Sequence, residues 1–399
     1  YIYLESAGNH NLYRELAQDS PSSHLASTLL LTIMRTSLLS LASLATSAWG
    51  YDQVLGFNTK VETETRSLDE IHKAALKEGG VVTLWHGGDS VNRQSGLKAA
   101  FEKRFPGMEL NVTVDLSKYH DARVDQQLAT GGKAVYVDSV ILQTLQDYPR
   151  WAQQGALLNY APKGFDQIQD AYKDTTASWY GVYIFGWGFG WNSNKLPGIK
   201  APAEYPDFLR PEFKNKLVLT YPNDDDAVLY AYQLIMQQYG VSWFQDLLKQ
   251  NPRWVRGTAT PSAMVKASNY TQAAYFAAGA GFQNAEPMHF GHPKSGKYVT
   301  WPQTAGILKD APHPEGAKLL HNFILSPEYQ KAVGTWSVRR DMPIPAGYPD
   351  IANETATNPA EFLRWMSDRT TVERLRFWIE AHIGTAQGVD PIYEAINMQ

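Results

Sequence analysis

The sequence predicts an α/β protein with two lobes, in which the chain leaves the first lobe along one long strand and returns near residue 305. The first observation is the stretch 182–191, where large aromatic side chains alternate with small or aliphatic ones over ten residues. A period of two over this length predicts a strand of about 33 Å, long enough to reach a second lobe. The second observation is that strand–helix units occur on both sides of the stretch. The alternative is a central strand of a single sheet.

The two faces of the predicted crossing strand differ in side-chain size. One face carries Tyr183, Phe185, Trp187, Phe189 and Trp191, while the other includes Gly186, Gly188 and Gly190. Because glycine leaves a face without side chains, another backbone or a ligand can approach it closely.

Residues before the crossing strand have the pattern of a parallel sheet with helices on both faces. Residues 67–70 form a capping box that begins a helix, and Gly79 and Gly80 end it. Strands are expected at 81–85, 108–114 and 135–142, and helices at 97–105 and 119–129. This βαβαβ order predicts the first lobe.

The same organisation resumes after the crossing strand. Strands are expected at 216–221, 254–256 and 271–277, with helices at 227–239 and 242–250. Thr260 is expected to cap a further helix, since Pro261 then takes the first helical position. Residues 279–300 are predicted to be a loop and 306–308 a strand that returns to the first lobe. Helices are expected at 315–325 and 327–334, and a long amphipathic helix or a pair of helices at 359–382.

Composition excludes several classes of function. The chain has 399 residues, a length that suits about two domains, and its 44% hydrophobic and 19% charged residues are typical of soluble globular proteins. A net charge of −4 offers no basic surface for nucleic acid. The absence of cysteine excludes disulfides, thiolate metal sites and a cysteine nucleophile.

The N-terminal region predicts secretion. Residues 34–48 have the layout of a signal peptide: a basic start, an apolar run too short to span a membrane, and small residues for cleavage. Residues 1–33 precede Met34 and are expected to be a non-structural extension; the alternative is a disordered tail before a small apolar helix. Asn111, Asn269 and Asn353 stand in glycosylation sequons, which agrees with a secreted glycoprotein. In a bacterium the location is the periplasm.

Six segments carry a resemblance to a known family through their order and spacing. They are VVTLWHGGDS, AFEKRFPGMEL, VDSVILQTLQDYPRWAQQGALLNYAP, GWGFGWNSNKLPG, LRPEFKNKLVLTYPNDDDAVLY and APHPEGAKLLHNFILSPEYQKAVG. With them the chain resembles the type 2 periplasmic, or extracellular, solute-binding proteins. The resemblance is to the branch of ferric-iron and related small-ligand components of ABC transporters. It covers about residues 80–340, whereas the segment after 340 departs from the compact bacterial pattern.

The resemblance implies a periplasmic-binding-protein-like class II fold, with a ligand cleft between two lobes that are joined by two crossing strands. This agrees with a first lobe at 67–183 plus 305–399 and a second lobe at 184–304. Capture of an anion, a metal or a small polar metabolite by hinge closure is then expected, without catalysis or a cofactor. A monomer is expected, with a membrane transporter as partner in a bacterium.

Three loops are candidates for the ligand site because each follows a strand and precedes a helix N-terminus. They contain His86, Gly87, Gly88, Asp89 and Ser90; then Gln143 and Thr144; then Thr258 and Thr260, with Arg256 just before them. An arginine at such a position can bind a carboxylate or phosphate through two hydrogen bonds. The alternatives are helix caps for Asp89 and Thr144 and a surface position for Arg256.

Carboxylates and aromatic rings widen the range of candidate ligands. Asp224 and Asp225 stand at a helix start, where the ordinary role is capping. If they face the cleft, they favour a cation, an amine or a hydrogen-bonding sugar. Trp187 and Trp191 are able to stack on a ring or cation, and core packing is the alternative.

A metal site is a separate hypothesis. Ferric-iron relatives have an adjacent tyrosine pair in the second lobe, and the counterpart here is Tyr275 followed by phenylalanine, which leaves one phenol. His289 and His292 have ligand-type side chains, although their loop is rich in glycine and proline, where solvated histidines are ordinary.

Catalytic motifs are absent from the sequence. It contains no G-x-S-x-G, H-E-x-x-H or G-x-x-x-x-G-K-[ST] pattern. The leading hypothesis is therefore a solute-binding protein. The alternatives are a ferric-iron-binding protein, a secreted enzyme that reuses the scaffold, and a surface-interaction protein.

Overall fold

The computed structural model describes residues 61–133, 135–279, 282 and 284–393, which belong to one compact unit that begins at Val61. The predicted signal peptide at 34–48 and the predicted extension at 1–33 lie outside the described residues. No helix in the described part of the chain has the length and apolarity needed to cross a membrane.

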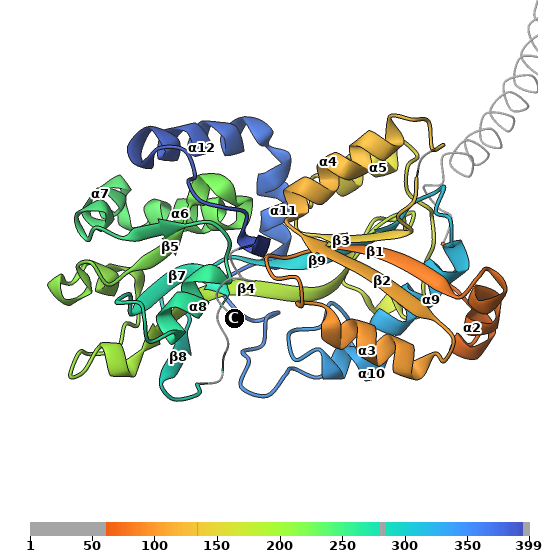
Figure 1. The fold of residues 1–399 in the computed structure, drawn as a ribbon, viewed down its shortest axis with the longest axis horizontal. Coiled ribbons are helices and arrows are strands. Elements are labelled where there is room, and N and C mark those ends of the chain that lie inside the picture. Colours follow the sequence, from red (N-terminus) through yellow and green to blue (C-terminus); the bar gives the residue numbers. More distant parts are fainter. Residues whose placement is uncertain (1–60, 134, 280–281, 283, 394–399) are drawn as a thin grey trace, which may run out of the picture. The chain divides into compact units, whose positions relative to one another are not determined.

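The first lobe is built on a parallel sheet that helices cover (Figure 1). Strand β1 (Val81–Gly87) lies between β2 (Glu109–Asp115) and β3 (Ser139–Leu142) and is parallel to both. The helices of this lobe are α2 (Leu68–Lys77), α3 (Ser95–Arg104), α4 (Ser117–Leu128), α5 (Asp147–Gln153), α9 (Pro314–Ile324) and α10 (Pro327–Ala332). The predicted βαβαβ order is therefore confirmed. Helix α2 begins with the predicted capping box, in which Ser67 and Glu70 bond each other's backbone N–H.

Strand β4 (Tyr180–Asn192) passes from one lobe to the other, as the period of two predicts. Its first half pairs with β9 (Thr300–Ile307), and its second half pairs with β7 (Ala274–Gly279) and β8 (Met288–Gly291). Strand β9 also crosses, because Trp301 lies in the hydrophobic core of the second lobe and Ile307 in that of the first. The two lobes are thus joined by two antiparallel, hydrogen-bonded strands.

The glycine face of β4 receives neighbouring side chains. A Cβ added at Gly190 would lie 2.6 Å from the ring of Tyr275, and one at Gly186 would lie 2.9 Å from Cγ2 of Thr300. The pairing of β4 with β7 shifts register after Gly188, where Ala277 on β7 adopts a φ of 51°. Side chains of the protein, those of Tyr275 and Thr300, therefore fill the space that the glycines leave on this face.

The second lobe has a smaller parallel pair, β5 (Val218–Thr220) and β6 (Arg253–Val255). Helices α6 (Asp226–Tyr239), α7 (Val241–Lys249) and α8 (Thr260–Lys266) surround it. Short 3-10 helices are η1 (Phe165–Gln167), η2 (Asp170–Tyr172), η3 (Ser193–Lys195), η4 (Tyr205–Leu209), η5 (Pro211–Phe213) and η6 (Pro222–Asp224). Part of the stretch 279–300, predicted as loop, forms β8, because residues 288–291 complete their hydrogen bonds with β4.

The C-terminal helices require a correction. The sequence assigned 305–399 to the first lobe, but α11 (Pro359–Ser367) and α12 (Arg369–Ile383) share the core of the second lobe. Their apolar stripes meet the aromatic side chains of α6, where the ring of Tyr230 lies 4.8 Å from that of Trp365. Figure 1 shows α12 beside α6, far from α9 and α10.

Candidate functional site

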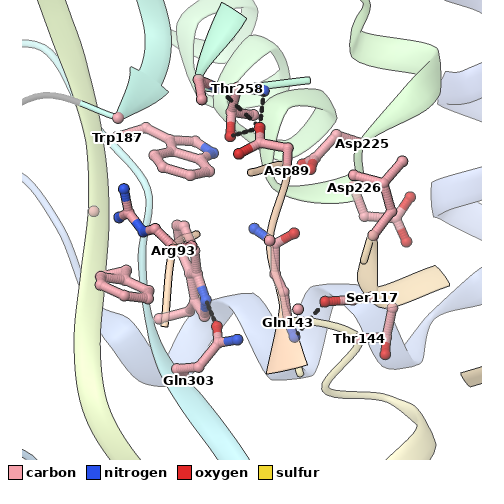
Figure 2. A pocket seen from close by; sticks show the side chains of 18 of the residues that line it. Asp89, Arg93, Ser117, Gln143, Thr144, Trp187, Asp225, Asp226, Thr258 and Gln303 are labelled. Carbon is pink, nitrogen blue, oxygen red and sulfur yellow. Dashed lines mark hydrogen bonds between the residues drawn. The ribbon is translucent and has the colours of Figure 1, made fainter. Parts of the chain in front are cut away.

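A cavity of about 720 Å³ lies between the lobes and is lined by residues of both. On the first-lobe side it is bordered by the loops after β1 and β3 and by the start of α4. On the other side it is bordered by β4, by the starts of α6 and α8, and by α12 (Figure 2). Its volume is in the range of sites that hold small organic molecules.

Close packing of three loops forms the first-lobe wall. A Cβ added at Gly87 would lie 2.1 Å from Oγ of Ser117, so a larger residue here would displace the Ser117 hydroxyl. The Ser117 hydroxyl in turn accepts a hydrogen bond of 3.0 Å from the backbone N–H of Gln143. The loop after β1, the start of α4 and the loop after β3 therefore meet at one point.

Asp89 bonds the opposite lobe instead of capping its own helix. Its Oδ2 accepts hydrogen bonds from the backbone N–H of Ala259 at 2.8 Å and from the Thr258 hydroxyl at 2.9 Å, and a third from the Thr258 N–H. Figure 2 shows these contacts at the edge of the cavity. The predicted role of Thr260 as N-cap is wrong: Thr260 is the first residue of α8 and is buried, since the carboxylate of Asp89 already takes the N–H groups just before it.

Two further polar contacts join the lobes beside Asp89. Lys118 donates across the cleft to Oδ1 of Asp224 at 2.5 Å, and Arg256 donates across it to the Tyr119 hydroxyl at 2.8 Å. Arg256 also donates to Oδ2 of Asp224, within the second lobe, at 2.9 Å. Burial lowers the pKa of Arg256, but these hydrogen bonds outweigh it and hold that pKa above its usual value. Arg256 is therefore neither an exposed surface residue nor a wall of the cavity.

We call this group of contacts the interlobe clasp. It consists of Asp89, Lys118 and Tyr119 in the first lobe and of Asp224, Arg256 and Thr258 in the second.

The carboxylates that follow Asp224 are satisfied inside the second lobe. Asp225 caps α6, accepting from the backbone N–H of Ala227 at 2.8 Å and of Val228 at 3.0 Å, as the capping interpretation expects. Burial raises the pKa of Asp225 to about 6. Asp226 pairs with Arg369 at 2.8 Å and also with Arg376, both on α12.

Aromatic side chains line the remainder of the cavity. They come from β4, β8 and β9 and from the segments around 282 and 336–348: Phe185, Trp187, Phe282, Phe290, Trp301, Trp336 and Tyr348. We call these seven residues the aromatic wall. The rings of Trp187 and Trp301 are 4.7 Å apart, edge to face. The buried Nε1 of Trp187 has no hydrogen-bond partner among the described residues.

Several residues predicted for the site lie elsewhere. His86 is buried, contacts the Tyr183 hydroxyl at 2.5 Å, and has its pKa lowered to about 3 by burial. Ser90 and Trp191 do not line the cavity, and Trp191 stacks on His289 at 5.3 Å. The Tyr275 hydroxyl donates to the Gly279 carbonyl at 2.9 Å.

Thr144 does line the cavity, and its hydroxyl neither caps α5 nor has a partner among the described residues. The cavity also includes Gly88, beside Gly87, and Asp121, whose pKa is raised to about 8 by burial and by the neighbouring charge of Asp147.

The histidines of the metal hypothesis are separated from the cavity. His289 contacts Glu286 at 3.1 Å, and His292 stacks on Phe282 with ring centroids 4.0 Å apart, where burial lowers its pKa to about 4. In the described residues no three histidines, aspartates or glutamates are grouped to hold a metal ion. The sequon residues Asn111, Asn269 and Asn353 are all exposed.

Sequence reasoning missed much of the cavity wall. The polar residues it missed include Arg93, Ser117, Asp226, Arg369 and Arg376. Ser117 follows a strand and was accessible to the same reasoning that found residues 86–90, but Arg369 and Arg376 reach the site only through the docking of α12 onto α6.

Two α/β lobes on two crossing strands, with a cavity between them, define the class of two-lobed periplasmic binding proteins. Residues 143–366 match the family described as bacterial extracellular solute-binding protein, and the chain belongs to that family. No curated protein matches the chain.

Solved structures share the fold at low sequence identity. The substrate-binding protein of an ABC transporter from Agrobacterium tumefaciens has a TM-score of 0.65 at 13% identity, covering 77% of this chain and 96% of its own. AfuA from Actinobacillus pleuropneumoniae, with fructose-6-phosphate bound, has a TM-score of 0.61 at 18% identity, and the match covers 77% of this chain and 100% of AfuA. Iron-bound HitA from Pseudomonas aeruginosa has a TM-score of 0.58 at 15% identity, and the match covers 75% of this chain and 99% of HitA. These similarities show the fold alone.

Proposed function

We propose that this solute-binding protein captures one small ligand in the cavity between its lobes and holds it by hinge closure, without a chemical step. The observation that carries the proposal is that one cavity of about 720 Å³ is walled by both lobes. A ligand seated there contacts both walls at once, so binding favours the closed arrangement.

The interlobe clasp supports reversible closure. Its bonds are few, polar and partly exposed: the side chain of Lys118 is 35% exposed, and that of its partner Asp224 is 10% exposed. A hydrogen bond to a charged group contributes about 1.5–3 kcal/mol, so a few such bonds are weak enough to open. Strands β4 and β9, which continue through both cores, then act as the hinge.

Membership of the family supports a location outside the cytoplasm, in the periplasm of a bacterium or secreted by another cell. In a bacterium the partner is a membrane ABC transporter that receives the ligand from the closed protein. We propose a monomer, with glycosylation at the exposed sequons where the source performs it.

Ferric-iron binding is the second candidate function, because iron-bound HitA shares the fold. The phenol of Tyr275, the single counterpart of the tyrosine pair, is bonded to a backbone carbonyl of its own strand. Titration with ferric citrate tests this candidate: coordination by a phenolate produces a visible charge-transfer band. A band that Tyr275→Phe abolishes establishes iron binding, and the absence of a band excludes coordination through this phenol.

Fluorescence energy transfer tests hinge closure directly. Because the chain has no cysteine, Glu109→Cys in β2 and Ser268→Cys after α8 create two exposed labelling positions, one in each lobe. Transfer efficiency is measured while fractions of a metabolite and metal extract are added, and native mass spectrometry identifies what is retained. A fraction that changes the efficiency and is retained intact supports the proposal.

A control pair, Glu109→Cys with Lys133→Cys, places both labels in the first lobe and is expected to give a constant signal. The proposal fails if no fraction changes the signal of the pair that spans the lobes. Conversion of the retained compound to a product establishes the enzyme instead.

A further inference from the structure

We infer that the cavity binds a small organic anion with a planar, apolar body, and that Arg93 binds its negative group. This inference rests on the proposed function and names the class of ligand for the same cavity.

The first step is the pairing of charges around the cavity. Four basic side chains line the cavity, and three of them form ion pairs with carboxylates. Lys118 pairs with Asp224, while Arg369 and Arg376 pair with Asp226. Within the described residues Arg93 forms no ion pair and no side-chain hydrogen bond; its guanidinium lies 5.9 Å from the ring of Phe185. Its charge is therefore available to an anionic ligand.

The carboxylates of the cavity do not offer an equivalent site for a cation. Asp89 accepts three hydrogen bonds from residues 258 and 259, and Asp225 accepts two from the start of α6. Burial and the neighbouring charge of Asp147 raise the pKa of Asp121, which favours its neutral form. The acidic side chains are thus satisfied or protonated, whereas the basic Arg93 is not.

A second donor lies on the same side of the cavity. Trp187 carries a buried Nε1–H without a partner among the described residues, and Figure 2 shows Arg93 and Trp187 next to each other. A buried donor without an acceptor is costly. A carboxylate that accepts from the guanidinium through two oxygens lies beside the indole ring, and the Nε1–H stays available to a second polar atom of the ligand.

The aromatic wall indicates that the body of the ligand is planar and apolar. Phe185 and Trp187 line the cavity next to Arg93, and Trp301 packs behind Trp187. Planar apolar groups stack on such rings over a large contact area. A cavity of about 720 Å³ also exceeds the needs of a single ion.

Titration of the full chain with a matched series of probes tests the inference. Benzoate and indole-3-acetate carry the predicted ring and charge; benzamide is the neutral analogue, benzylamine the cationic one, and acetate lacks the ring. Tryptophan fluorescence and calorimetry give each affinity. Benzoate and indole-3-acetate are expected to bind at least about tenfold more tightly than the other three.

Variants locate the anion. Arg93→Gln is expected to weaken benzoate binding about tenfold to a hundredfold and to leave benzamide unchanged. Arg104→Gln is the matched control, because Arg104 also lies over a phenylalanine, Phe105 at 4.9 Å, but at the far end of α3. Thermal unfolding of each variant checks that it is folded.

The outcomes separate this inference from the proposed function. The inference is overturned if benzamide or benzylamine binds as tightly as benzoate, or if Arg93→Gln binds benzoate like the parent protein. If ferric citrate or a neutral sugar changes the interlobe energy transfer and no aromatic carboxylate does, hinge closure stands and the ligand class is wrong. If no compound of any class changes it, the proposed function fails as well.

Discussion

The two sides of the cavity are held by different chemistry. Behind the first-lobe wall lie His86, His120 and His321, which burial keeps neutral by lowering their pKa values to about 3 or 4. The opposite wall depends on arginine–carboxylate pairs, above all Asp226 with two arginines of α12. The difference teaches that mild acid destabilises the first lobe through three buried histidines, while loss of one carboxylate charge loosens α12 in the second lobe. The predictions below address these two sides and then the clasp between them.

The largest effect is expected from pH acting on His321. Its Nε2 lies 2.6 Å from the Ser139 hydroxyl and its Nδ1 lies 2.6 Å from that of Tyr180, and burial lowers its pKa from 6.5 to about 3. In the unfolded chain His321 therefore binds a proton below pH 6.5, whereas in the folded protein it stays neutral until about pH 3. Stability is complete above pH 6.5 and falls as the pH drops, by ~3 kcal/mol at about pH 4.5 for this residue.

Urea unfolding at about pH 7.5 and 4.5 measures this loss. In His321→Gln the loss of unfolding free energy between the two pH values is expected to be smaller by ~3 kcal/mol, because His321 no longer takes up a proton on unfolding. His382→Gln, at an exposed histidine of α12, is expected to lose as much as the parent protein. Equal losses in the parent and in His321→Gln would show that His321 is not the acid-sensitive group.

An intermediate effect is expected at Asp226. Asp226→Asn removes the charge that Arg369 and Arg376 share, at a carboxylate whose side chain is only 14% exposed. Two guanidinium groups are then left without their shared counter-charge, which is expected to cost ~2–3 kcal/mol. Hydrogen exchange is expected to rise across α12 and to stay unchanged in β1–β3.

The control for Asp226 is Glu361→Gln, which breaks the exposed pair of Glu361 with Arg364 on α11. Such surface pairs contribute less than about 1 kcal/mol, so exchange in α12 is expected to stay as in the parent protein. Unchanged exchange across 369–383 in Asp226→Asn would refute the role of this pair in holding the helix.

The smallest effect is expected at the clasp. Asp89→Asn keeps one acceptor oxygen for the N–H groups of residues 258 and 259 but removes the charge, so a cost of about 1 kcal/mol is expected. That cost shifts the equilibrium between closed and open lobes about fivefold, which the interlobe energy transfer detects. Ser90→Ala, at the next residue, is expected to give the signal of the parent protein.

The sequence predicts the fold because its signals are local. Alternation along β4, the capping box at Ser67 and the strand-to-loop order around residues 86–90 each depend on neighbours in the chain. Asp89, Gln143, Thr144 and Thr258 reach the cavity for the same reason, since the carboxyl ends of strands collect at one edge of a sheet.

The remaining residues of the wall depend on long-range contacts. Arg369 and Asp226 are 143 positions apart, and the amphipathic pattern of 359–382 shows that a helix packs without showing where. Arg93 stands among polar residues and is exposed, and nothing in the local sequence shows that it borders the cavity. Tyr275 and Thr260 do not line the cavity, for a related reason: the Tyr275 hydroxyl donates to a backbone carbonyl and Thr260 is buried, and single-sequence patterns show neither.

The pairing of β4 with β9 has a mechanical consequence. Between Tyr180 and Gly186 the two strands form a ribbon whose hydrogen bonds resist stretching and sliding. Torsion along its length is the soft deformation of such a ribbon, because strands differ widely in twist at little cost. Under the proposed hinge closure, the rates of solute entry and exit depend on how fast this short ribbon twists, a property of its backbone that is separable from how tightly the cavity wall holds the solute.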